Sequence, residues 1–154
     1  MASPLTLMLP VIPGTSLQTL AATLGQNNPQ LDAALTSIGT VHYARILLLD
    51  ASAPNLQPDL QPGASPNASY VIAVITEFDG SFDAYIQDFV SQVGMVFDAL
   101  LQFVVGGPAL IPVANNVAAF EAFITLNDAS QHAPNTNLFQ AYTATVPTIL
   151  ASLP

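Results

Sequence analysis

The chain has 154 residues, of which ten are acidic and one is basic, so its formal net charge is −9 at neutral pH. This balance argues against nucleic acids and anionic lipid surfaces as partners, because both attract clusters of Lys and Arg. The chain has no cysteine, which excludes disulfides, thiolate zinc sites and cysteine nucleophiles. The length predicts a single domain over residues 1–154 that is large enough to form its own core.

The composition also bears on assembly and on membranes. Only 7% of the residues are charged, while 51% are hydrophobic. Charged side chains are depleted where proteins bury surface against one another, so we expect a homodimer or larger assembly, with a charge-poor secreted monomer as the alternative. The apolar N-terminus lacks the basic residues of a signal peptide. No stretch reaches the roughly 18 uninterrupted apolar residues of a spanning helix, so no membrane segment is predicted.

The first fifty residues predict a strand, two helical stretches and a second strand. Leu5–Ile12 is the first strand, and Ser16 is placed to cap the helix that follows. Gly25–Pro29 is expected to interrupt that helix, because both glycine and proline disfavour helix interiors. The second helical stretch runs to Gly39, which is predicted as its C-cap. Val41–Asp50 is a strand by length and composition.

The middle of the chain predicts an excursion, a strand and the longest helix. Residues 51–68 are rich in proline and are expected to leave the sheet as a surface excursion. Tyr70–Phe78 is predicted to be the antiparallel partner of Val41–Asp50. Ser81 is expected to cap a helix over Phe82–Phe103, whose apolar residues recur at close to 3.6-residue spacing.

The last third predicts a helix, a strand and a short terminal helix. Asn116 is expected to cap the helix, Leu138–Thr143 to form the strand, and Val146–Leu153 the terminal helix. The order strand, helix, strand, strand, helix, strand predicts an α+β fold, a ferredoxin-like βαββαβ sheet with its helices on one face. Both faces of Val41–Asp50 are apolar, so the second face needs a cover. Face-to-face dimerisation into a dimeric α/β barrel would supply it.

Several short segments carry a resemblance to a known superfamily. They are Leu5–Gly14, Val41–Arg45, Glu77–Ser81, Phe120–Ile124 and Phe139–Ile149. In these segments the chain resembles small bacterial proteins of the dimeric α/β-barrel superfamily, which includes dye-decolourising peroxidases, chlorite dismutases and cofactor-free monooxygenases. The haem-binding members use a helical histidine with a distal Arg or Asp, whereas Phe82–Phe103 here contains no histidine. We therefore expect no cofactor and keep haem as the alternative.

Arg45 is the only basic residue of the chain. Side chains alternate across a strand, so Arg45 and His42 are expected on opposite faces and cannot line one site unless the strand bulges. A charge-assisted ion pair with Glu77 or Asp79 on the adjacent strand is the favoured role for Arg45. Capture of an anionic substrate is the alternative.

The candidate ligand-binding residues are Arg45, His42, Tyr43 and Glu77. A histidine among apolar neighbours, such as His42, is more often a hydrogen-bonded core residue than a base, and both readings stay open. His132 lies in a polar segment and is expected to be solvated. With two histidines and no cysteine, no metal-ligand cluster is predicted.

The sequence leaves three functions open. The first is a small binding or accessory protein that holds an apolar or weakly anionic molecule between sheet and helices, since such sites need a mostly apolar lining. The second is a self-assembling structural protein with charge-poor interfaces. The third is a haem-dependent or cofactor-free oxidoreductase that uses Arg45 with His42 or His132. No nucleotide-binding or hydrolase motif is present.

Overall fold

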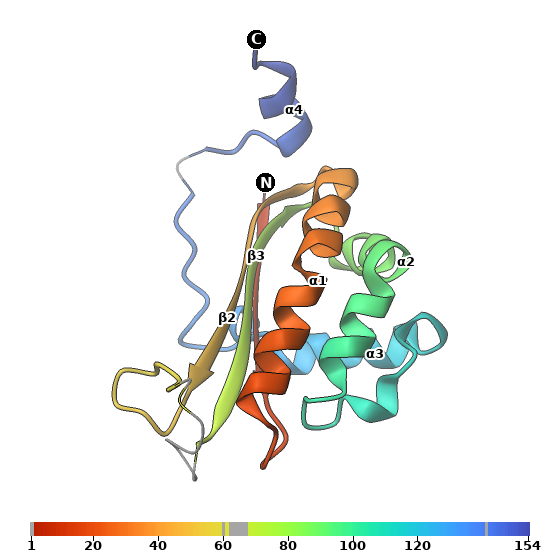
Figure 1. Ribbon diagram of the computed structural model, residues 1–154. Helices are drawn as coiled ribbons and strands as arrows, with labels where there is room; N and C mark the ends of the chain where they lie inside the picture. Colours follow the sequence, from red (N-terminus) through yellow and green to blue (C-terminus); the bar gives the residue numbers. More distant parts are fainter. Residues whose placement is uncertain (1, 60, 62–67, 141) are drawn as a thin grey trace.

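The computed structural model describes residues 2–59, 61, 68–140 and 142–154. In these ranges the chain forms an α+β fold, which confirms the predicted class (Figure 1). The strands are β1 (Ala2–Pro10), β2 (Val41–Asp50) and β3 (Tyr70–Asp79). The α-helices are α1 (Leu17–Ile38), α2 (Phe82–Leu101), α3 (Val117–Asn127) and α4 (Val146–Ala151), with short 3-10 helices η1 (Pro108–Leu110), η2 (Val113–Asn115) and η3 (Ala129–Gln131).

The strands form an antiparallel sheet of order β1-β3-β2, so the predicted antiparallel pairing of β2 with β3 is confirmed. Helices α1, α2 and α3 lie on one side of this sheet, and the chain after η3 runs along the other side (Figure 1). On the helix side, the alternating residues Leu5, Leu7 and Leu9 of β1 are buried. The opposite face, formed by the other half of each strand's residues, is called the open face below.

The predicted strand over Leu138–Thr143 is not formed in the part of it that the structure describes. The outer edge of β1, where another strand would add, is already occupied. The Thr6 amide donates to Asp128 Oδ1 at 2.8 Å, and Ser130 Oγ donates to the Pro4 carbonyl at 3.2 Å. Proline lacks an amide donor, so Pro4 offers even less to a further strand. The described residues therefore form a three-stranded sheet, and the predicted βαββαβ order is not confirmed.

Helix α1 is continuous, contrary to the predicted interruption at Gly25–Pro29. Its predicted ends are confirmed: Ser16 Oγ accepts from the Thr19 amide at 3.4 Å, and Gly39 adopts the left-handed conformation with φ 67°. The apolar side chains Leu24, Leu31 and Leu35, on both sides of Pro29, pack against the core. Burial of a continuous apolar face thus outweighs the local penalty of glycine and proline, as expected when tertiary packing supplies most of a helix's stability.

A chain of aromatic rings links the sheet to α2 and α3. The rings of Phe78 and Tyr85 stack with centroids 4.1 Å apart, and contacts continue through Phe89 and Phe97 to Phe120, which is fully buried. Phe89, which lies within the predicted helix of regularly spaced apolar residues, therefore belongs to the core. The helix ends at Leu101, two residues before the predicted end.

The proline-rich excursion over 51–68 lies partly outside the described residues, since 60 and 62–67 are not described. Its described part contains turns and is mostly exposed. The buried Asp50 holds both ends together, because its Oδ1 accepts hydrogen bonds from Ser52 Oγ at 2.6 Å and from the Ser69 amide at 3.2 Å. Within the described ranges, no helix has the length and hydrophobicity needed to cross a membrane.

Candidate functional site

Residues 132–140 and 142–151 are called the C-terminal strap below: the part before α4 runs along the open face of the sheet, and α4 lies beyond the end of the sheet at which β1 begins (Figure 1). Two hydrogen bonds attach the strap near the start of β1. Gln140 Nε2 donates to the Ala2 carbonyl at 3.3 Å, and the Val146 amide donates to Asp79 Oδ2 at 2.7 Å. The second oxygen of Asp79 lies 3.2 Å from His42 Nε2. Asp79 therefore joins the strap to both β3 and β2.

A cavity of about 230 Å³ lies between the open face and the strap. His42, Tyr43 and Glu77 line it from the sheet, so three of the four predicted site residues come together. The strap contributes mainly apolar and aromatic side chains, namely Leu138, Phe139, Tyr142, Ala144 and Ile149, together with Gln140.

A β-bulge explains how neighbouring residues reach the same cavity. Val41 pairs with Phe78 and Tyr43 with Glu77, so His42 is an extra residue opposite a continuous β3. The bulge breaks the alternation that would send His42 and Tyr43 to opposite faces. A bulge was named as the condition for His42 to share a site with a residue of the other face, but no residue pattern indicated that a bulge forms here.

Arg45 lies outside this cavity. It is opposite Ile75, with its side chain exposed. Within the described part of the chain, Arg45 forms no ion pair, so the predicted pair with Glu77 or Asp79 is wrong. Asp79 is instead paired with His42 across the bulge.

The carboxylates beside the cavity differ in their electrostatics. Burial raises the pKa of Glu77 above its usual value, and the charge of His42 and a hydrogen bond with Tyr43 offset this only in part. Glu77 is 8% exposed, and its Oε2 has no hydrogen-bond partner among the described residues. Burial, reinforced by the Glu77 charge, raises the pKa of Tyr43. For Asp79, burial acts in the same direction, but the bonds from Val146 and His42 outweigh it and lower the pKa.

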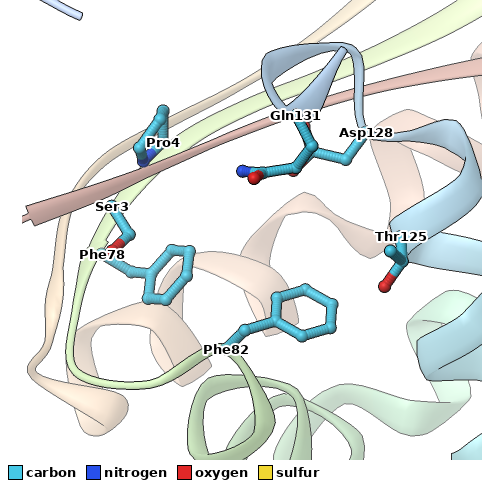
Figure 2. A pocket seen from close by; sticks show the side chains of 7 residues that line it. All are labelled: Ser3, Pro4, Phe78, Phe82, Thr125, Asp128 and Gln131. Atoms are coloured by element: carbon cyan, nitrogen blue, oxygen red, sulfur yellow. The ribbon is translucent and has the colours of Figure 1, made fainter. Parts of the chain in front are cut away.

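A second cavity, of about 330 Å³, lies between the sheet and the helices. Figure 2 shows the rings of Phe78 on β3 and Phe82 on α2 at one side of it, with the Gln131 side chain reaching in from η3. Ser3, Pro4, Thr125 and Asp128 complete the lining. None of the four predicted site residues is among them.

Asp128 fixes the wall of this second cavity. Its side chain is 2% exposed, and Oδ1 accepts hydrogen bonds from the Thr6 amide at 2.8 Å and from Ser130 Oγ at 2.7 Å. Ser130 Oγ in turn accepts from Gln131 Nε2 at 3.2 Å. The amide of Gln131 is thus oriented by a carboxylate that also seals the β1 edge. Sequence reasoning missed these residues, because the contacts join positions more than 120 residues apart.

Neither cavity fits the haem site that the resemblance implies. His42 is on a strand with Nε2 occupied by Asp79, and His132 follows η3 at the surface, so neither is a helical ligand. The described residues also contain no group of three or more His, Cys, Asp and Glu side chains that could hold a metal ion.

No family model matches the chain, and no curated protein or solved structure matches it. The resemblance to dimeric α/β-barrel proteins therefore stays a prediction.

Proposed function

We propose that the chain is a small-molecule binding protein that holds an apolar, uncharged ligand in the cavity between the sheet and helices α2 and α3 (Figure 2). The observation that carries the proposal is the pairing of two phenyl rings with a few fixed polar groups in a space of about 330 Å³. Sites for small molecules have this volume and combine apolar side chains with oriented hydrogen-bonding groups; here three apolar residues face four polar ones.

Each wall has a distinct role in this proposal. Phe78 is buried and its ring stacks on Tyr85, so it offers a rigid surface against which a planar ligand can pack. Phe82 belongs to the first turn of α2 and is partly exposed, so it can contact a ligand near the mouth. The Gln131 amide supplies hydrogen bonding in an orientation set by Ser130.

The lining favours a neutral ligand over a weakly anionic one. The cavity has no basic side chain, and Asp128 contributes a carboxylate to its wall. A bound anion would lose water without gaining a counter-charge, which is unfavourable in a partly buried site. Of the two kinds of ligand expected from the sequence, apolar and weakly anionic, the cavity therefore favours the apolar kind.

A fluorescence titration tests the proposal with a matched pair of probes. N-phenyl-1-naphthylamine is neutral, and 1-anilinonaphthalene-8-sulfonate carries the same rings with a negative charge. We expect saturable enhancement with the neutral probe and weaker binding of the sulfonate. Thr125→Trp fills the cavity from an exposed position of α3, and should weaken the neutral probe at least tenfold. Leu126→Trp is the control, since Leu126 is 74% exposed and does not line the cavity. Equal binding by both variants would overturn the proposal.

A second candidate function is self-association, and the open face favours it. The face presents Met8, Leu47, Leu49 and Val71 without helix cover, and Met8 is 37% exposed. Apolar surface of this kind, in a chain with few charges, is typical of an interface between copies. The second copy would cover this part of the face, whose residues do not line the cavity under the strap, as in a dimeric α/β barrel. Light scattering of the wild type and of Met8→Glu tests this: a wild-type dimer that the substitution dissociates supports it, and a wild-type monomer refutes it.

A further inference from the structure

We propose that the cavity under the C-terminal strap is a separate binding site, selective for a small organic cation such as an amine or a quaternary ammonium group. The site is distinct from the cavity of Figure 2 and shares none of its lining residues. Three independent features of the described residues support it: an unpaired buried carboxylate, aromatic rings around the cavity, and the scarcity of positive charge.

The unpaired carboxylate is Glu77. It is more than nine-tenths buried, it lines the cavity, and its Oε2 has no hydrogen-bond partner in the described part of the chain. A buried carboxylate without a partner is unstable in its charged form, and a cation in the cavity would supply the missing counter-charge. Oε2 is itself closed off from solvent, so a cation in the cavity would stabilise the carboxylate through its charge and not by direct contact with this oxygen.

Aromatic rings provide the second feature. Tyr43 lines the cavity from β2 and remains 50% exposed, while Phe139 and Tyr142 line it from the strap with 90% and 81% exposed. Exposed rings grouped around a cavity can close on a ligand and bury apolar surface in doing so. The faces of such rings attract cations, and aromatic groups beside a carboxylate are the usual recognition elements for quaternary ammonium ligands.

The charge of the chain provides the third feature. With a net charge of −9, the protein attracts cations toward its surface over distances longer than a contact. The one arginine does not line the cavity. His42 is the basic group that does; its Nε2 faces Asp79, and its charge offsets only part of the effect of burial on Glu77. No other side chain of the cavity lining competes with a ligand cation for Glu77.

Calorimetric titration with choline and with its neutral carbon isostere, 3,3-dimethylbutan-1-ol, tests the site. We expect choline to bind the wild type and the isostere to bind at least tenfold more weakly. Glu77→Gln should weaken choline at least tenfold, whereas Asp32→Asn should change it less than twofold. Asp32 is exposed on α1, so its substitution makes the same change in net charge away from the cavity.

Variants of Tyr43, one of the aromatic residues that line the cavity, complete the test. Tyr43→Phe keeps the ring and should retain choline binding, while Tyr43→Leu removes it and should weaken binding about threefold or more. Thr125→Trp, which fills the other cavity, should leave choline binding unchanged. The two proposed sites can therefore be refuted independently of each other. Circular dichroism of each variant excludes misfolding. The proposal is overturned if choline does not bind below 10 mM (about 2.7 kcal/mol), if the isostere binds as well, or if Glu77→Gln binds choline as tightly as the wild type.

Discussion

Asp79 is predicted to control the attachment of the C-terminal strap, and Asp79→Ala measures its contribution. The substitution removes the acceptor of the Val146 amide, which lies 2.7 Å from Oδ2, and the contact of Oδ1 with His42. A hydrogen bond to a charged group contributes about 1.5–3 kcal/mol, and a partly exposed ion pair adds less than about 1 kcal/mol. A loss of roughly 2 kcal/mol raises the opening equilibrium constant of the strap about 30-fold.

Amide hydrogen exchange is the direct assay, because the Val146 amide is itself the donor. We expect exchange at Val146, and at Ile149 in the first turn of α4, to accelerate about 30-fold in Asp79→Ala, with little change in the core strands. Asp32→Ala serves as the control on an exposed helix position. Unchanged protection at Val146 in Asp79→Ala would refute the reasoning.

The pKa of Asp79 adds a pH dependence with a definite sign. Because the pKa is lowered in the folded protein, the carboxylate stabilises the attached strap above its usual value of 3.8. This contribution is lost as the pH falls through the lowered value. Val146 in the wild type should therefore lose its extra protection, relative to Asp79→Ala, as the pH is lowered from 7 into the acid range below 3.8. If the ratio of Val146 protection in the wild type to that in Asp79→Ala were the same at pH 7 and in acid, the role assigned to the Asp79 carboxylate would be contradicted.

Three further predictions concern stability. Glu77 has a raised pKa, so its ionisation lowers the stability of the fold as the pH rises. Glu77→Gln should therefore raise Tm above that of the wild type by about 2–4 °C at pH 7. Near pH 4 calorimetry should show the same Tm for both proteins. Asp128→Ala removes the acceptor of bonds from Thr6 and Ser130 and should lower the free energy of unfolding in urea by about 3 kcal/mol, with a smaller loss for Asp128→Asn. Gly25→Ala should raise that free energy by about 1 kcal/mol, since an added Cβ meets nothing within 4 Å; a loss would show that α1 is strained there.

The sequence predicted the features that depend on short-range geometry. Ser16 and Ser81 were identified as helix caps, and each accepts from the amide three residues on. Gly39 was identified as a C-cap, and it has the positive φ that this position favours. These interactions need only a few neighbouring residues, so a local pattern determines them.

The failures share a dependence on contacts between distant segments. The run Leu138–Thr143 has the composition of a strand, but the β1 edge that would receive it is held by Asp128 and Ser130. Asn116 was expected to cap α3 with its side chain, which donates instead to the carbonyls of Leu110 and Pro112.

For the same reason, only a part of the candidate site was predicted. His42, Tyr43 and Glu77 were selected as polar groups on apolar strands, and they share a cavity. Arg45 was selected because it is the only Lys or Arg of the chain. That property of the composition does not indicate which residues lie near Arg45 in the fold. The strap that closes the cavity could not be inferred, because its attachment to Asp79 spans 67 residues.

The order β1-β3-β2 leaves the two borders of the sheet unequal. The border of β1 is closed by Asp128 and Ser130, whereas β2 has no neighbouring strand beyond it in the described residues. A ten-residue apolar border strand is a template for aggregation, and a charge on it is a common protection. Arg45 is at the middle of β2, so two β2 strands that paired antiparallel along most of their length would bring two guanidinium groups close together. The single cation thus discourages growth of the sheet from copy to copy along the β2 border.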